Sequence, residues 1–202
     1  GLRPDVIISD SWGDGEYFGL SSEVLDTAQQ IAPVIGLRVD GRPVEEPLAR
    51  FAELAESIAG ESAVTEREDA EATLAAARER LVEAVAANPD IEVLGASGSA
   101  NEMFVAVPEA YPDLEFFREA GVQLVEPETD DKFWQTLSWE EANRYHADLI
   151  LADARLGGRD WMMSMVPASV QRVPAFEADQ VAPWQLSFAF GYRAFADVVD
   201  QM

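Results

Sequence analysis

A long helical pattern between residues 65 and 87 constrains the fold more than any other feature of the sequence. Alanine and glutamate, both strong helix formers, dominate this stretch. One apolar face persists for about six turns, and it consists of Ala70, Leu74, Ala77, Leu81 and Val85. Thr65 and Glu68 match a capping box at the start, and Asn88-Pro89 follows the end. Because globular helices average roughly 11–12 residues, this one is either an ordinary core helix or a rigid spacer between two lobes. Spacing alone leaves both open.

Before the long helix, the sequence predicts one βαβ unit. Residues 5–9 and 33–37 are short runs rich in β-branched residues, which is typical of buried parallel strands. A helix is predicted between them near residues 22–30, and another over residues 48–58, where Gly60 suits the end. Two parallel strands cannot cover both faces of their own sheet. We therefore expect an incomplete first lobe that is cut short at its amino end.

After the long helix, the sequence predicts enough elements for a complete α/β lobe. Strands are expected over residues 91–96, 103–107, 122–125, 148–152 and 172–176. Helices are expected over residues 112–120, from Ser138 to near His146, in short pieces over 159–171, and over 186–202. Ser138 and Glu141 match a second capping box. The expected organisation is a first lobe over residues 1–62, a connecting helix over 63–89 and a second lobe over 90–202.

The composition argues against several classes of partner and site. Lys and Arg total 14 and Asp and Glu total 38, so the formal net charge is −24, and nucleic acid and anionic lipid surfaces are poor partners. There is no cysteine and only one histidine, His146, which argues against thiol catalysis and against a zinc or iron site built from side chains. There is no apolar run of roughly 18 residues, so no transmembrane segment is expected.

Three short sequence motifs resemble those of a known family. The first is Leu2-Arg-Pro-Asp-Val-Ile-Ile8, the second is Leu137-Ser-Trp-Glu-Glu-Ala142 shortly before Asp148, and the third is Trp184 with the helix expected after it. In this order they resemble the solute-binding proteins of ABC importers for iron–siderophore and vitamin uptake, over essentially the whole chain. The resemblance implies a periplasmic-binding-protein-like fold, in which two α/β lobes joined by a single long helix clamp a ligand. It therefore favours a spacer role for residues 65–87.

The resemblance also implies a location and a partner. In this family the first phrase lies in the middle of the first lobe, so the missing strands would precede Gly1. Family members work outside the cytoplasmic membrane, in a periplasm or at the cell surface, and a lipid anchor would here lie upstream of Gly1. They dock on the importer's membrane permease through one exposed acid on each lobe. The second-lobe acid corresponds to Glu140, with Glu141 as a possible substitute; alternatively, both complement a helix dipole, and the capping box favours that for Glu141.

The ligand cleft of such a fold lies at the carboxyl ends of the strands. The side chains that we expect in its wall are Trp12, Tyr17, Met103, Phe104, Trp184 and Phe188. Phe188, on the predicted terminal helix, fits a core position better. Arg155 and Arg159 flank a Gly-Gly loop and could meet an anionic ferric chelate, unless acidic neighbours hold them in ion pairs.

These features predict a non-catalytic binding protein with a ferric siderophore as ligand, because aromatic walls suit large, flat or catecholate molecules. Haem and cobalamin, also known to the family, are weaker expectations, and no resident cofactor or metal is expected. The alternatives are a hydrolase or reductase on a doubly wound sheet and an interaction domain without a small ligand. No nucleophile elbow, phosphate loop or dinucleotide fingerprint supports an enzyme, and Gly13-Asp-Gly15 is too short to form one.

Overall fold

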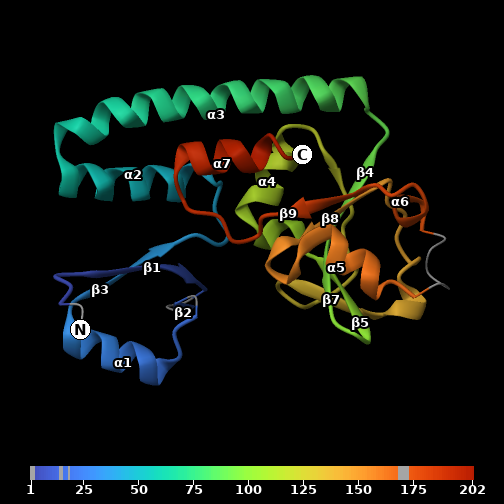
Figure 1. Ribbon diagram of the computed structural model, residues 1–202, viewed down its shortest axis with the longest axis horizontal. Helices are drawn as coiled ribbons and strands as arrows, with labels where there is room; N and C mark the ends of the chain where they lie inside the picture. The colour runs from blue at the N-terminus through green and yellow to red at the C-terminus, as the bar shows by residue number, and fades with distance from the viewer. Residues whose placement is uncertain (1–2, 14–15, 18, 168–172) are drawn as a thin grey trace.

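The computed structural model describes every residue of the chain except 1–2, 14–15, 18 and 168–172. It shows two separate sheets, each with helices, and one long helix that joins them (Figure 1). The predicted fold class, a two-lobed α/β structure with a long connecting helix, is confirmed. None of the helices in the described part of the chain has the length and hydrophobicity that crossing a bilayer requires.

The first lobe holds a three-stranded sheet with the order β2-β1-β3. Its strands are β1 (Ile7–Trp12), β2 (Glu16–Tyr17) and β3 (Val34–Arg38). Helix α1 (Ser22–Ile31) precedes β3, and β1 and β3 pair in parallel, as the predicted βαβ unit requires. Strand β2, antiparallel to β1, has no counterpart in the sequence prediction, because a two-residue strand contains no alternation to detect.

Helices α2 (Glu45–Ala59) and α3 (Glu61–Ala87) form a helical hairpin. Only Gly60 separates them, and its backbone φ of 72° lies in the region that glycine enters at little cost. The long helix therefore begins before the predicted cap, and the prediction that Thr65 caps it is wrong. Thr65 lies inside α3 because no residue between it and Gly60 interrupts the helical backbone.

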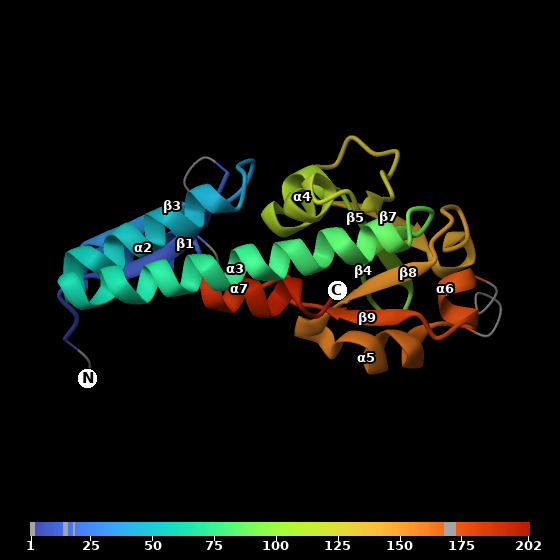
Figure 2. The same ribbon diagram turned by 90° about the horizontal axis from the view of Figure 1, so that it is seen from above.

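Helix α3 extends along much of the molecule and contacts both lobes (Figure 2). It packs on α2 and on α7 (Tyr192–Val199). Its buried face consists of Ala70, Leu74, Ala77 and Leu81. A bidentate ion pair adds to this contact, since Arg80 Nη2 donates to both carboxylate oxygens of Asp200 at 2.7 Å. The apolar face that the sequence displayed is thus the face that holds the two lobes to one helix.

The second lobe is built on a six-stranded sheet with the order β7-β5-β4-β8-β9, and β6 pairs with β4. The parallel pairs are β4–β8, β8–β9 and β4–β6, whereas β5 runs antiparallel to β4 and β7. Register places Val93 of β4 opposite Leu149 of β8, and Ile150 of β8 opposite Val181 of β9. The strands are β4 (Glu92–Gly98), β5 (Glu102–Ala106), β6 (Gln123–Leu124), β7 (Trp134–Ser138), β8 (Leu149–Asp153) and β9 (Val181–Trp184).

Two hydrophobic clusters pack against this sheet. One includes Leu114, Phe117 and Phe195 and joins the sheet to α3, α4 and α7. The other includes Ile150 and Met162 and joins it to α5 and α6. The helices of this lobe are α4 (Pro112–Glu119), α5 (Gly158–Met165), α6 (Pro174–Glu177) and the 3₁₀ turns η1 (Pro108–Ala110), η2 (Trp139–Glu141) and η3 (Ala154–Leu156).

Three predicted elements of the second lobe are wrong. The strand predicted over residues 172–176 is replaced by helix α6, because Pro174 at a first helical position favours a helix start; Arg172 itself lies outside the described residues. The true last strand is β9. The helix predicted to reach His146 is the single 3₁₀ turn η2, and the terminal helix begins at Tyr192 rather than at residue 186.

Candidate functional site

A cavity of about 290 Å³ lies between the two lobes. We call it the interlobe cavity. Strand ends and the loops beside them supply most of its wall, as the parallel pairing of β1 with β3 and of β4 with β8 leads one to expect. It is lined by Trp12, Glu16, Tyr17 and Gly19 of the first lobe, by Tyr111, Phe133, Trp134 and Arg155 of the second, and by Leu186 and Ser187 of the segment between β9 and α7.

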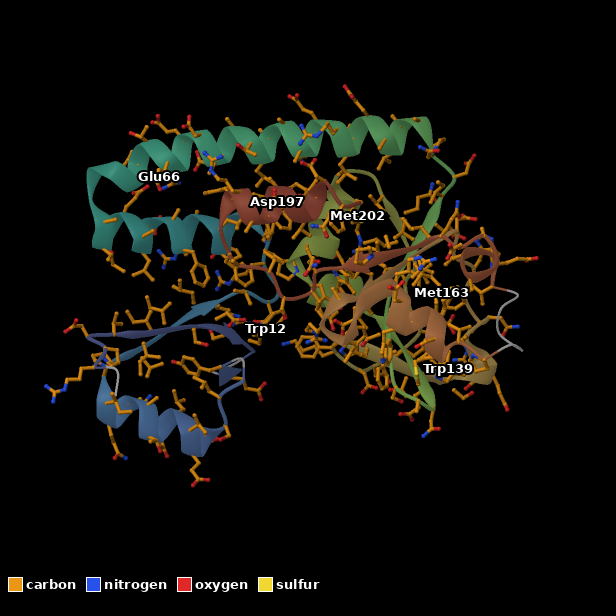
Figure 3. All side chains as sticks on the ribbon, viewed as in Figure 1. Trp12, Glu66, Trp139, Met163, Asp197 and Met202 are labelled. Atoms are coloured by element: carbon orange, nitrogen blue, oxygen red, sulfur yellow. The ribbon has the colours of Figure 1, made fainter. Side chains whose placement is uncertain are left out.

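Aromatic rings of both lobes meet in this cavity. Trp12 lies between the lobes (Figure 3), and its ring approaches Tyr111 and Phe133 edge-on, with centroid distances of 6.5 and 6.0 Å. Tyr111 also contacts Trp134 at 5.3 Å. The Trp12 indole Nε1 donates to Asp10 at 2.8 Å, which fixes the orientation of the ring. The wall is therefore preorganised and can offer flat apolar contact to a ligand of matching size.

Tyr17 reaches the cavity because β3 has a glycine beside it. A Cβ on Gly36 would lie only 2.7 Å from Cε1 of Tyr17. The absence of a side chain at Gly36 therefore allows the Tyr17 ring to lie close to the β3 backbone.

Trp184 does not line the cavity but packs behind two residues that do, Tyr111 and Trp134. It is 2% exposed, its ring contacts Tyr111 at 5.1 Å, and its Nε1 donates to Asp113 at 2.5 Å. Burial raises the pKa of Asp113 to about 6, although the hydrogen bond from Trp184 and the backbone N–H groups at the start of α4 oppose the shift. Burial also raises the pKa of Tyr111, with Asp113 contributing, so its phenol stays protonated and can donate a hydrogen bond.

Arg155 is held in place by a buried carboxylate. Asp153, at the end of β8, accepts from Arg155 Nε at 2.9 Å and from Nη2 at 2.7 Å, and Ser97 Oγ donates to it at 2.9 Å. Although burial of Asp153 opposes ionisation, the hydrogen bonds and charge of Arg155 dominate and lower the pKa of Asp153. A bidentate pair of this kind fixes the plane of the guanidinium as well as its position.

Two further cavities adjoin the interlobe cavity. One, of about 530 Å³, shares Trp134 and Arg155 with it and is also lined by Phe104 and Asp153. The other, of about 540 Å³, shares Trp12, Leu186 and Ser187 and is lined by Asp10, Phe51, Asp113, Phe188 and Phe190, among others. A ligand larger than the interlobe cavity could extend into either neighbour.

An ion pair crosses between the lobes beside this site. Lys132, the only lysine of the sequence, donates from Nζ to Asp40 at 2.7 Å, and its ammonium lies 4.7 Å from the centre of the Phe133 ring. Asp40 is 1% exposed and also accepts from the backbone N–H of Gly13 at 2.8 Å. Burial of Asp40 works against ionisation, but Lys132, Gly13 and Arg38 together lower its pKa. The pair thus links the loop that follows β3 to the loop that precedes β7.

Replacing Lys132 by methionine should lower the free energy of unfolding at pH 7 by about 1–3 kcal/mol. The buried Asp40 carboxylate loses a charged partner in the variant, whereas Arg38 and Gly13 remain. Because the pKa of Asp40 is depressed in the folded state, this stabilisation is present at neutral pH and is lost as the pH falls through that pKa. Urea denaturation of K132M at neutral and acidic pH measures it.

The matched control for that change is Arg144→Met. Arg144 pairs with Glu141 within the second lobe, and both side chains are exposed. We expect R144M to change stability by less than about 0.5 kcal/mol. Equal effects of the two substitutions would show that the interlobe pair has no special role.

Only some of the residues predicted from sequence to bind ligand line the three cavities. Trp12, Tyr17 and Arg155 line the interlobe cavity and Phe104 the cavity next to it. Met103 is 1% exposed and belongs to the core, because it alternates with Phe104 to the other face of β5. Arg159 lines none of these cavities and pairs with Asp160 and Asp179. Phe188 precedes the terminal helix and borders the third cavity, so its predicted helical position is wrong.

Tyr111, Phe133 and Trp134 are the residues that sequence reasoning missed. Trp134 is the first residue of β7, a strand that the pattern did not reveal; Phe133 directly precedes this strand, and Tyr111 precedes α4. The only available signal was the local density of aromatic residues. Glu140 and Glu141 lie on η2, where both are exposed. Among the residues that the structure describes, no three His, Cys, Asp or Glu side chains gather as a metal site would need.

A comparison with protein families found one match, to the family described as periplasmic binding protein, over residues 1–182. The chain belongs to this family. Periplasmic binding proteins are extracytoplasmic solute-binding components of ABC importers, and they are not enzymes. This excludes the hydrolase and reductase alternatives. A comparison with curated protein sequences found no match.

Solved structures of periplasmic binding proteins share the fold. DesE, a ferric-siderophore receptor protein from Streptomyces coelicolor, is 29% identical with a TM-score of 0.83, and the match covers 98% of this chain and 68% of DesE. The siderophore periplasmic binding protein from the fuscachelin gene cluster of Thermobifida fusca is 21% identical with a TM-score of 0.65, over 98% and 71% of the two chains.

PiuA, an iron uptake ABC transporter substrate-binding protein from Streptococcus pneumoniae, is 16% identical to this periplasmic binding protein with a TM-score of 0.74. The match covers 98% of this chain and 70% of PiuA. At such low identity, PiuA and the Thermobifida protein support the fold alone. The high TM-score of DesE shows that the arrangement of both lobes around α3 is that of a solved member.

Proposed function

We propose that this protein binds a ferric siderophore in the interlobe cavity and delivers it to the membrane permease of an ABC importer. The observation that carries the proposal is the cavity itself. Rings from both lobes, together with the oriented Arg155 guanidinium, surround a space that two further cavities enlarge. Such a site suits a bulky chelate with apolar arms and exposed oxygen atoms. The similarity to DesE, a ferric-siderophore receptor protein, supports it.

We propose the same division of the chain that the sequence suggested. Residues 1–62 form the first lobe, residues 63–89 belong to the connecting helix, and residues 90–202 form the second lobe. The continuous helix α3, packed on α2 of the first lobe and on α7 of the second, supports this division. A single rigid connection limits how far the cavity can open, so we expect binding to involve only small rearrangements of the two lobes.

The binding role assigned to Arg155 can be tested against Arg159. Substitution of Arg155 by methionine should weaken binding of a ferric siderophore by about tenfold or more, because hydrogen bonds to charged groups contribute about 1.5–3 kcal/mol. Arg159→Met should leave the affinity within about twofold, because Arg159 lies outside the three cavities. Quenching of tryptophan fluorescence by ferric siderophores measures both. Absence of binding by every ferric siderophore tried, with haem or cobalamin binding instead, would overturn the proposed ligand.

The permease contact that we propose on the second lobe is Glu140. Glu141, its neighbour on η2, is already engaged, since its carboxylate accepts from Ser138 at 3.1 Å and from Arg144 at 2.7 Å. The hydrogen bond from Ser138 is the first cause of the lowered pKa of Glu141. Its role is therefore accounted for within the lobe, and the exposed Glu140 is the better candidate for contact with basic residues of a permease.

Reversal of charge by Glu140→Lys should reduce iron uptake by cells that depend on this protein by about tenfold, with ligand affinity unchanged. Electrostatic complementarity mainly sets register and association rate, so the loss should appear in transport and not in binding. The control is Glu119→Lys, since Glu119 is exposed at the end of α4 in the same lobe. Normal uptake with E140K would remove Glu140 from the docking surface.

A further inference from the structure

The charged groups that line the three adjoining cavities are mainly acidic. Arg155 is the only cation among the described lining residues, and it stands against the four carboxyl groups of Asp10, Glu16, Asp113 and Asp153. Asp113 can carry charge at neutral pH, since its pKa is about 6, and Arg155 with Ser97 lowers the pKa of Asp153 in spite of its burial. Positive charge is therefore not in excess among the described residues that line this site.

The charge of Arg155 is, in addition, already compensated. Its guanidinium pairs with Asp153 through Nε and Nη2, and the side chain of Asp153 is only 1% exposed. A buried carboxylate at this distance cancels most of the field that the cation would project into the cavity. Arg155 can still offer N–H donors and a flat face to a ligand. It recognises shape and acceptors more than it attracts negative charge.

The charged residues at the rim do not reverse this balance. Lys132 and Arg38 both pair with Asp40. Adding Asp40, Lys132 and Arg38 to the described lining residues gives five carboxyls and three cations. The aromatic rings of the interlobe cavity add the negative potential of their faces, which favours neutral or cationic groups. The net charge of −24 repels anions at longer range.

Resting on the function proposed above, we infer that the cavity selects ferric chelates of neutral or positive net charge over ferric trianions. Iron(III) bound by three hydroxamate groups, each a monoanion, has a neutral core. Iron(III) bound by three catecholates, each a dianion, is a trianion. The acidic lining repels the tris-catecholate trianion and does not repel the tris-hydroxamate complex. The substrate class is therefore the tris-hydroxamate siderophores. This refines the sequence-based expectation, in which aromatic walls suited catecholates as well.

Two ferric chelates of opposite charge test this inference on the purified protein. The cationic probe is the iron(III) complex of desferrioxamine B, a tris-hydroxamate with a pendant ammonium group, and the anionic probe is iron(III) enterobactin, a tris-catecholate. Equilibrium dialysis with radioactive iron measures both without relying on optical quenching. We expect the hydroxamate complex to bind at least about 100-fold more tightly at low salt, and the ratio to narrow as ionic strength rises.

A single charge substitution separates electrostatics from shape. Glu16 is exposed in the short strand β2 and lines the interlobe cavity. Glu16→Gln keeps its size and should narrow the affinity ratio of the two probes by about five- to tenfold, mainly through tighter binding of the trianion. Glu83→Gln on the exposed side of α3 is the matched control and should leave the ratio within about twofold.

The measured affinities distinguish charge selection by the cavity from siderophore binding in general. Preference for the hydroxamate complex that E16Q and salt both reduce supports the inference. Equal or tighter binding of the catecholate complex overturns it and leaves the proposed siderophore function standing. A preference that neither E16Q nor salt changes also overturns it, since shape would then be the cause. Binding of neither chelate, and of no other ferric siderophore, would overturn the proposed function and the inference with it.

Discussion

Substitution of Trp184 by alanine should lower the free energy of unfolding by about 3–5 kcal/mol. Trp184 is 2% exposed, and its ring contacts Tyr111 at 5.1 Å and Trp134 at 6.0 Å. Alanine would leave a void beneath the interlobe cavity, and Asp113 would lose the indole N–H that donates to it at 2.5 Å. Urea denaturation followed by circular dichroism at pH 7 measures the loss, because fluorescence itself changes when a tryptophan is removed.

The conservative control is Trp184→Phe. It keeps most of the ring volume and removes the donor to Asp113, so the loss should fall to about 1–3 kcal/mol. Trp184→Ala should also weaken ligand binding, since Tyr111 and Trp134 line the cavity and rest on this ring. A loss of less than about 1 kcal/mol for W184A would show that the ring is dispensable to the packing of the second lobe.

The parts of the fold that could be predicted from sequence are those in which local pattern and tertiary structure agree. The apolar face of α3 packs on α7, and the β-branched runs of β1 and β3 pair in parallel. Capping boxes show the limit of local motifs. The box at Ser138 forms, with Ser138 in an extended conformation that exposes its side chain to Glu141. The equivalent phrase at Thr65 does not, because the turn at Gly60 starts the helix earlier.

The missed half of the site depends on a strand that breaks the usual alternation. In β7 the two buried positions are Gln135 and Leu137. A buried glutamine gives no hydrophobic signal, and only the folded chain satisfies it, because Tyr145 donates to its amide oxygen and its nitrogen donates to Glu128. Without β7, the position of Trp134 in the wall of the cavity that Trp12 also lines could not be inferred. Trp12, at the carboxyl end of a recognisable strand, could be predicted at the cleft.

Replacement of Asp113 by asparagine should change how stability depends on pH. Burial raises the folded-state pKa of Asp113 from its ordinary 3.8 to about 6. Between these values the folded protein holds a proton that the unfolded chain has lost, so this group stabilises the fold at acidic pH. That contribution disappears as the pH rises through about 6. Relative to D113N, the wild type should therefore lose about 2–3 kcal/mol of stability between pH 4 and pH 7.

Asparagine suits this test because its amide oxygen can still accept from Trp184 while no proton can be gained or lost. Unfolding by urea at pH 4, 5, 6 and 7 gives the free energy of unfolding of wild type and variant. The contributions of the other carboxyl groups cancel in the difference between the two proteins. Asp197→Asn, at an exposed position of α7 (Figure 3), is the control and should retain the wild-type dependence. Parallel pH profiles for wild type and D113N would mean that Asp113 is ionised in the folded protein throughout, and that Trp184 with the start of α4 fully offsets its burial.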